Sequence, residues 1–169
     1  NPSVHFNRKF PGSAQFVVDN YEVAGAFTKG GWEFMKSALK NADKYFAGER
    51  WVLGDYSAAQ VDRAKLEAEL RKRYYADFID RWRAYLKAAS VARYASLKDA
   101  AVKLNALSGN QSPLLALFWL CTQNTAVDDP AVATAFQPVH TVVPPTAVDR
   151  YIAPHNPNYM NALVALQAS

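Results

Sequence analysis

One stretch of the chain, from residue 57 to residue 89, contains neither glycine nor proline and repeats apolar side chains at nearly helical spacing. The apolar positions are Leu66, Leu70, Tyr74, Phe78, Trp82, Tyr85, Leu86 and Ala89. Acidic residues precede basic ones by four positions on the polar side, as in Glu67/Arg71, and each such pair stabilises a helix by about 0.2–0.5 kcal/mol. The pattern predicts one nearly unbroken helix over 57–89, about 50 Å long, with Phe78 and Trp82 buried.

A shorter amphipathic helix is predicted before it, with Thr28 as the N-cap and Gly48 at the end. Its apolar face follows steps of three and four residues and consists of Trp32, Met35, Leu39, Ala42 and Phe46. The link over residues 49–54 then combines a charged pair, bulky apolar residues and a turn glycine. We expect Trp51 and Leu53 to insert between the two helices and fix their angle.

Four further helices are predicted from their starting residues. Ser96 opens a capping-box-like start, and proline follows a capping residue at Ser112, Asp129 and Asn156. The first of these helices is expected to carry Leu97, Ala100, Ala101, Leu104 and Leu107, with Gly109 at its end, and the third is a short helix through about Phe136.

The remaining segments are predicted to be less regular. Residues 137–155 hold four prolines and are expected to form a surface loop. Residues 1–27 are expected to be irregular or extended, with a short hairpin, and no strong strand is expected after them. The fold class is therefore all-α: a helical bundle over 28–169 with one long central helix and a short irregular or extended lead-in over 1–27, all in one domain of residues 1–169.

The charges are distributed unevenly over the 169 residues, whose net charge is +4. Residues 1–100 hold 17 Lys or Arg and 12 Asp or Glu, whereas residues 101–169 hold 2 and 3. The second part is therefore expected to be mostly core, or to be covered by something outside this chain. Its longest apolar run, residues 114–121, is too short to cross a bilayer, which takes about 20 residues. The chain does not begin with Met, and we interpret it as a fragment of a longer protein, with any anchor or export signal outside it.

Residue patterns typical of catalysis or metal binding are weak. His5, His140 and His155 lack metal-ligand spacing, so no metal and no cofactor is expected. Cys121 lies inside the apolar run, where burial makes a thiol inert, which argues against a Cys121–His140–Asn124 constellation. Glu49 and Asp55 could form a catalytic carboxylate pair, but they flank a turn beside Arg50, and a pairing or capping role is more plausible for Glu49. Gly30 and Gly31 do not form a phosphate loop, because the lysine and the spacing of that motif are missing.

A basic cluster around residues 71–73, with Arg81 and Arg83, is the best sequence argument for nucleic-acid binding. Acidic residues are interleaved with it on the same predicted helix: Glu67, Glu69, Asp77 and Asp80. A solvated face with salt bridges explains this pattern better, and no nucleic acid is expected as a partner.

Five short motifs follow one another along the chain: FTKGGW at 27–32, ERWVLG at 49–54, YYADFIDRW at 74–82, LSGNQSPL at 107–114 and FQPVH at 136–140. In this order they resemble the IcmF/TssM family of large inner-membrane proteins from type VI secretion systems. Residues 27–32 and 49–54 resemble its "F-T-x-x-G-(W/Y)" and "(E/D)-(R/D)-W-V-L-G" motifs, and residues 74–82 resemble its "Y-x-x-(D/E)-Y-x-x-x-W" helix. Residues 107–114 are similar to "L-S-G-x-x-S-P-L", and residues 136–140 to "F-x-P-(V/L)-H". Residues 159–166 also fit a family helix, so the resemblance spans about 25–166 and matches residues 1–24 least. The motif positions assigned a structural role are Phe27, Thr28, Gly31, Trp32, Arg50, Trp51, Val52, Leu53, Gly54, Trp82, Ser112 and Pro113.

The resemblance implies the helical part of a periplasmic region, with a β-rich domain after it and with transmembrane helices and a cytoplasmic nucleotide-binding-like domain before it. It implies a structural, non-enzymatic role in the secretion membrane complex. The partners it implies for the complete protein are a TssJ-like outer-membrane lipoprotein and a TssL-like inner-membrane protein, with self-association possible and membrane contact only through segments outside this chain. The alternatives from other classes are a peptidoglycan-cleaving enzyme domain and a basic helical nucleic-acid-binding module.

The nearly uncharged, proline-stiffened segment after residue 135 is the predicted interaction surface. Its candidate contact residues are Phe136, Gln137, Pro138, Val139, His140 and Val143. An equally weighted interpretation is that this segment packs along the bundle and seats the following domain, and the two roles are compatible.

Overall fold

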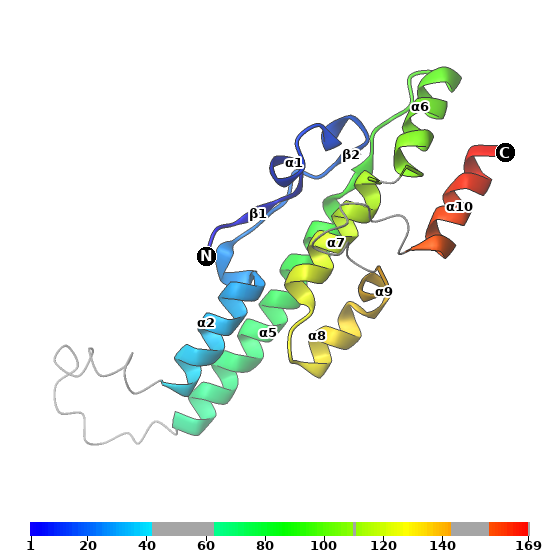
Figure 1. Ribbon diagram of the computed structural model, residues 1–169. Helices are drawn as coiled ribbons and strands as arrows, with labels where there is room; N and C mark the ends of the chain where they lie inside the picture. Colours follow the sequence, from blue (N-terminus) through cyan, green and yellow to red (C-terminus); the bar gives the residue numbers. More distant parts are fainter. Residues whose placement is uncertain (42–62, 110, 143–155, 169) are drawn as a thin grey trace.

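The computed structural model describes residues 1–41, 63–109, 111–142 and 156–168, and helices dominate it (Figure 1). The N-terminal elements are β1 (Val4–His5), α1 (Phe6–Lys9), the 3-10 turn η1 (Ser13–Gln15), β2 (Val17–Val18), β3 (Glu22–Val23) and the 3-10 turn η2 (Gly25–Phe27). They are followed by α2 (Lys29–Lys40), α5 (Arg63–Ala88), β4 (Ser90–Val91), α6 (Leu97–Leu107), α7 (Pro113–Thr125), α8 (Pro130–Ala135), α9 (Gln137–His140) and α10 (Pro157–Ala168). The mostly helical fold class is confirmed.

Helix α5 is the long helix predicted from the sequence, and its 26 residues extend over about 39 Å. Phe78, Trp82 and Tyr85 are fully buried on one face, which confirms the prediction for Phe78 and Trp82. Leu70, expected on the same face, is 40% exposed, so burial of this face decreases toward the N-terminal end of the helix. The predicted residues 57–62 lie outside the described part of the chain.

Helix α2 runs beside α5 and begins as its sequence predicts (Figure 1). The Thr28 hydroxyl accepts a hydrogen bond from the Gly31 N–H at 3.2 Å, which makes Thr28 the N-cap. Trp32 and Leu39 are buried and Met35 packs against the core, as the spacing predicted. Helix α2 ends at Lys40, with Asn41 as its C-cap, and not at the predicted Gly48. Gly48 and the link of Trp51 and Leu53 lie outside the described residues.

The N-terminal residues form two separate strand pairs rather than one local hairpin. β1 pairs antiparallel with β3, whereas β2 pairs antiparallel with β4, which follows α5. The expectation of no strong strand after residue 27 is corrected by this short strand, Ser90–Val91. The backbone groups of an extended segment need partners, and here the chain after α5 supplies them, as in the bond from the Ala92 N–H to the Phe16 carbonyl at 2.8 Å.

The predicted starts of the later helices are confirmed by their caps. The Ser96 side chain accepts from the Asp99 N–H at 3.1 Å, and that of Ser112 accepts from the Leu115 N–H at 3.3 Å. Asp129 accepts from the N–H groups of two residues at the start of α8. Leu97 is the first residue of α6, as expected, and its side chain is 92% exposed there, whereas Leu107 at the other end of the helix is buried.

The segment after α8 departs from the sequence prediction. Residues 137–155 were expected to form a loop, yet Gln137–His140 is helix α9, which accommodates Pro138 because the first turn of a helix needs no N–H there. Residues 143–155 lie outside the described part of the chain.

Helix α7 is the centre of the core and contains the apolar run of residues 114–121. It contacts α2, α5, α6 and α9, and its buried residues include Leu115, Leu117, Leu120 and Cys121. Within the weakly charged second part of the chain, burial is concentrated in α7, whereas much of α10 is exposed, with Val164 at 53% and Leu166 at 58%, so the expectation that this part is mostly core holds for α7 and not for α10. Among the described helices, none combines the length and the apolar character needed to span a bilayer.

Candidate interaction site

Two aromatic side chains of α5 donate hydrogen bonds to successive backbone carbonyls of the η2 turn, just before α2. The Tyr74 hydroxyl donates to the Ala26 carbonyl at 2.7 Å, and Trp82 Nε1 donates to the Phe27 carbonyl at 2.7 Å. Burial raises the pKa of Tyr74 to about 12, so its hydroxyl keeps its proton for this bond. Because each bond joins a side chain to main chain, the position of α5 relative to the start of α2 is set at two points.

The turn itself requires two of the motif residues. The Thr28 hydroxyl donates to the Gly25 carbonyl at 2.8 Å while it caps α2. A Cβ at Gly31 would lie 2.3 Å from the Ala26 carbonyl oxygen, so only glycine allows the helix to approach the turn this closely.

Stacked rings fill the space between α2 and α5. The Trp32 ring stacks on Tyr75 at 4.5 Å between centroids and meets the edge of Phe78 at 5.0 Å. The Phe27 ring stacks on Tyr74 at 5.6 Å. We name this assembly the aromatic joint. Its members are the rings of Phe27, Trp32, Tyr74, Tyr75, Phe78 and Trp82, together with Thr28 and Gly31 of the adjoining turn.

Trp32 also ties the aromatic joint to the turn between α7 and α8. Its Nε1 donates to the Asp128 carboxylate at 3.1 Å, and the Lys36 ammonium binds the same carboxylate. The hydrogen bonds from Lys36 and Trp32 hold the pKa of Asp128 below its ordinary value.

The remaining motif residues serve packing or lie outside the described residues. Ser112 is fully buried as the N-cap of α7, and Pro113 is the first residue of that helix. Residues 50–54 are outside the described part of the chain.

The predicted interaction surface is only partly accessible. Gln137 and Pro138 are exposed on α9, whereas Phe136 is 1% exposed and belongs to the core. Val139 is half-buried, and its carbonyl accepts from the Thr122 hydroxyl at 2.9 Å. His140 is also half-buried and forms a hydrogen bond through Nε2 with Thr125 at 2.8 Å, and burial lowers its pKa. Val143 lies outside the described residues.

The described residues do not bring Cys121, His140 and Asn124 together as a catalytic triad. Burial raises the pKa of the Cys121 thiol to about 12, so the reactive thiolate is disfavoured. His140 bonds Thr125, and the Asn124 side chain bonds the backbone of Leu120 and Lys29. No group of three or more potential metal-binding side chains occurs in the described parts of the chain. Glu49 and Asp55 lie outside them.

The basic cluster on α5 has protein partners within this chain. Arg71 forms an ion pair with Glu67 at 2.8 Å. The Arg81 guanidinium donates to the Tyr21 hydroxyl at 3.5 Å and lies over the Phe27 ring, 5.7 Å from its centroid. Both contacts support the interpretation of a solvated, salt-bridged face.

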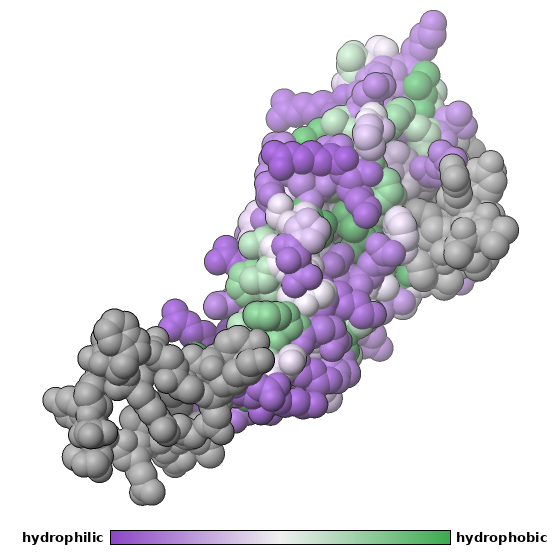
Figure 2. Space-filling view, turned by 60° about the vertical axis from the view of Figure 1, so that its left-hand side comes forward, coloured by the Kyte–Doolittle hydropathy of each residue, from purple (hydrophilic) through white to green (hydrophobic). Residues whose placement is uncertain are grey.

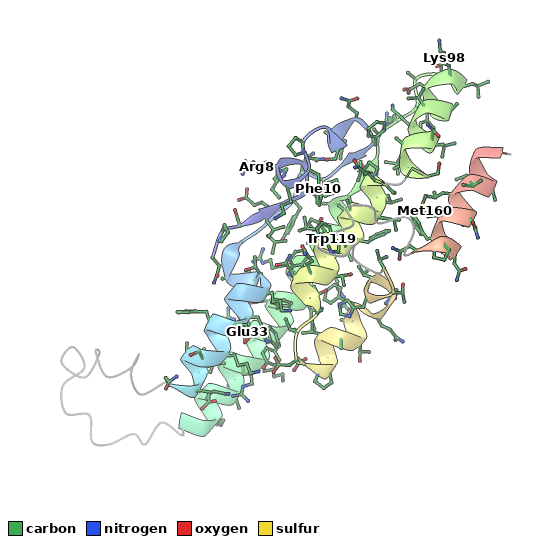
Figure 3. All side chains as sticks on the ribbon, in the orientation of Figure 1. Arg8, Phe10, Glu33, Lys98, Trp119 and Met160 are labelled. Atoms are coloured by element: carbon green, nitrogen blue, oxygen red, sulfur yellow. The ribbon has the colours of Figure 1, made fainter. Side chains whose placement is uncertain are left out.

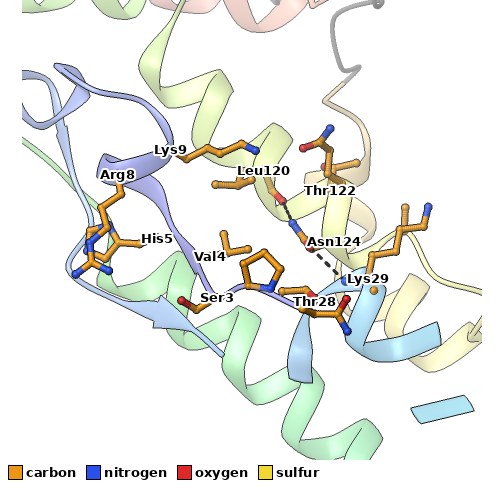
Figure 4. A pocket seen from close by; sticks show the side chains of 15 residues that line it. Ser3, Val4, His5, Arg8, Lys9, Thr28, Lys29, Leu120, Thr122 and Asn124 are labelled. Carbon is orange, nitrogen blue, oxygen red and sulfur yellow. Dashed lines mark hydrogen bonds between the residues drawn. The ribbon is translucent and has the colours of Figure 1, made fainter. Parts of the chain in front are cut away.

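A cleft of about 780 Å³ lies between the N-terminal residues, the start of α2 and the last turn of α7 (Figure 4). Cations line it from Arg8, Lys9 and Lys29, and none of its described lining residues carries a carboxylate. Sequence reasoning missed this cleft because its walls come from three segments far apart in the chain.

A buried acid was also missed. Asp19 is fully buried, its N–H donates to the Asn7 side chain at 2.9 Å, and its Oδ1 accepts from the Tyr21 N–H at 2.9 Å. Burial raises the pKa of Asp19 above its ordinary value. The short spacing from Asp19 to Tyr21 is that of an Asx turn, and this signal was available in the sequence.

Comparison with known proteins defines the family. The family model described as "IcmF-related: Intracellular multiplication and human macrophage-killing" matches residues 1–126, and the chain belongs to this family. The match includes residues 1–24, where the motif resemblance was weakest, and it ends before residues 127–169.

A particular relative agrees with that assignment. The chain is 30% identical over 105 residues to the type VI secretion system component TssM1 of Pseudomonas aeruginosa. The aligned part is 61% of this chain and 9% of TssM1, so the chain spans only a small part of that relative's length. No solved structure matches the chain.

Proposed function

We propose that this chain is a structural segment of a type VI secretion membrane complex, a periplasmic helical spacer in a TssM-like protein that links inner-membrane and outer-membrane components. Membership of the IcmF-related family and similarity to TssM1 support the assignment to a type VI secretion system. The observation that carries the structural role is the aromatic joint: two family motifs meet there, and their side chains bond the backbone of the same chain.

Such a joint suits a spacer because it resists changes in the angle between helices. A hydrogen bond to a backbone carbonyl has a preferred direction, and the carbonyl cannot rotate away as a side chain can. The Trp82 indole is also fully buried, so water does not compete for its bond. Force applied at one end of α5 is therefore transmitted along a continuous helix into α2 and α7.

The proposed partners are proteins of the secretion complex. Contacts with a TssJ-like lipoprotein and a TssL-like protein are assigned to parts of the complete protein outside this chain. Within the chain, the exposed residues Gln137 and Pro138, together with Val143, are the candidate contacts. Self-association through this surface belongs to the same proposal.

The two alternatives gain no support from a specific observation. A peptidoglycan-cleaving enzyme needs paired carboxylates or an equivalent polar set in a cleft, and the described lining of the large cleft holds none. Two of the basic residues of α5, Arg71 and Arg81, have partners inside the chain, which argues against a nucleic-acid groove.

A secretion assay paired with melting curves tests the proposal, with variants made in the gene that encodes the complete protein. Gln137→Arg should leave the melting temperature of the purified chain unchanged, because Gln137 is exposed, and should abolish secretion, because an unpaired charge buried in an interface costs several kcal/mol. Val143→Asp should abolish secretion for the same reason. Asn20→Arg, which adds a charge at an exposed position away from α9, is the matched control and should secrete normally.

A second set of variants separates the structural role from the enzyme alternative. The structural role makes the following prediction. Cys121→Ser, His140→Ala and Glu49→Gln should preserve secretion wherever the melting curve shows that the fold is intact. Loss of secretion in a fully folded Glu49→Gln or Cys121→Ser variant would favour an enzyme. Full secretion from both charged variants would remove the α9 segment from the interface.

A further inference from the structure

Residues 93–98, which we name the tip segment, lie at one end of the molecule. They connect β4 to the start of α6, and all six are exposed. Lys98 marks this end in Figure 3, opposite the end at which α2 finishes and α5 starts. The tip segment is therefore the part of the described chain that would meet a flat surface first at this end.

The tip segment is positively charged. Between residues 81 and 98 the sequence has five Lys or Arg and no Asp or Glu, and Arg93 and Lys98 lie on the tip segment itself. The next carboxylate, Asp99, is already engaged, since it accepts from the Ala95 N–H at 2.8 Å and forms an ion pair with Lys103 at 2.8 Å. Helix α10, which packs against α6, contains no charged residue, so the neighbouring element adds no negative charge.

Apolar side chains stand among these cations. Leu97 is 92% exposed and Tyr94 is 47% exposed, and Val91 and Val102 on either side are 39% and 57% exposed. Figure 2 shows hydrophobic and hydrophilic side chains next to one another at this end of the molecule. Cations, a half-exposed tyrosine and a protruding leucine together are typical of segments that lie in the headgroup region of a membrane.

We propose that the tip segment binds the surface of a bilayer that contains anionic phospholipids. Arg93 and Lys98 contact the phosphates, while Leu97 and Tyr94 enter the boundary between headgroups and acyl chains. A bilayer fits better than a protein partner because a stable protein interface takes about 20–30 residues a side, far more than this convex six-residue protrusion offers. A fluid surface accepts a single protruding leucine without a preformed pocket. This inference goes beyond the proposed role in secretion and does not depend on it, and it departs from the expectation that membrane contact occurs only through segments outside this chain.

Vesicle sedimentation with the purified chain tests whether the cations of the tip segment drive binding to anionic lipid. The chain should bind vesicles of phosphatidylcholine mixed with phosphatidylglycerol and should bind pure phosphatidylcholine weakly. Each cation near such a surface strengthens binding about fivefold, so Arg93→Gln combined with Lys98→Gln should weaken it about 25-fold. Lys72→Gln combined with Arg73→Gln removes the same charge from an exposed part of α5 and should change binding less than about twofold. Equal losses from the two double variants would overturn the proposal, as would equal binding to both kinds of vesicle.

A fluorescent probe tests insertion. Leu97→Cys can be labelled with an environment-sensitive dye, because the buried Cys121 thiol, whose pKa is raised to about 12, does not react. The dye at position 97 should brighten and shift to the blue with anionic vesicles, whereas a dye on Gln137→Cys, exposed on α9, should not. Similar responses at the two positions, or none at position 97, would overturn insertion. Leu97→Ser should weaken vesicle binding while leaving the melting temperature unchanged, because this side chain is 92% exposed.

Discussion

The aromatic joint and helix α7 are both buried, but they are held in different ways. In the joint, Tyr74 and Trp82 combine large rings with polar atoms that bond the backbone of another element. Helix α7 also takes part in such bonds, from the Thr122 hydroxyl to the Val139 carbonyl at 2.9 Å and from the Tyr85 hydroxyl to the Leu117 carbonyl at 3.4 Å, but most of its buried residues are aliphatic.

The difference shows that the relative position of two helices and the filling of the core depend on different interactions in the same chain. The joint depends on directed hydrogen bonds and on a close backbone approach at Gly31, so it tolerates few replacements. The core around α7 depends on filling space, and aliphatic cores accept swaps that conserve volume. Substitutions of similar size should therefore have unequal effects in the two regions.

The largest expected effect is at Gly31. Gly31→Ala should lower the free energy of unfolding by about 3 kcal/mol, because its Cβ would meet a backbone oxygen at 2.3 Å that no rotamer change can relieve. Gly30→Ala is the matched control in the same helix, where the Cβ would meet only the Asn1 side chain, which can move. Urea denaturation of both variants measures the difference, and equal stabilities would show that the turn is not a rigid part of the joint.

The next effect compares the two regions directly. Trp82→Phe keeps an aromatic ring but removes the donor to the Phe27 carbonyl, and it should cost about 1–3 kcal/mol. Leu117→Met conserves volume in α7 and should cost less than about 1.5 kcal/mol. Chemical denaturation of both variants measures how much unfolding free energy each substitution removes. If Leu117→Met proved the more damaging of the two, the contrast between directed bonds and volume would be wrong.

The smallest effect concerns pH. Because burial raises the pKa of Asp19 above its ordinary 3.8, its contribution to stability is present at low pH and is lost as pH rises through the folded-state value. Relative to the parent, Asp19→Asn should therefore become more stable as pH rises from below 3.8 toward neutrality. The charged and titratable groups facing Asp19 are His5 and Tyr85, and both stay in the variant.

Asp128→Asn provides the control of opposite sign. The pKa of Asp128 is lowered by its bonds to Lys36 and Trp32, so its contribution is present above the ordinary value and is lost as pH falls. This variant should become less stable relative to the parent over the same rise in pH. Unfolding free energies measured across the range should give two curves of opposite slope, and parallel curves would refute the assignment for Asp19.

Much of the helical framework was predictable because helix signals are local. Thr28, Ser96 and Ser112 cap the helices they were expected to cap, and the spacing of Phe78 and Trp82 placed both in the core. The candidate site was less predictable. Phe136 lies in the core, as the equally weighted packing interpretation of this segment would have it, rather than on an interaction surface. Helix α9 replaces part of an expected loop, because a proline is compatible with the first turn of a helix as well as with a loop.

The sequence by itself determined the helical class, the long helix, the capping residues and the family motifs, since each depends on residues within one or two turns of one another. Only the tertiary structure decided where the motifs meet. It placed Trp82 on the Phe27 carbonyl, paired β2 with β4 and built the cleft and the buried Asp19. These features join residues far apart in the chain, so the free energy that selects them comes from shared burial and from pairing backbone groups, which no local pattern records.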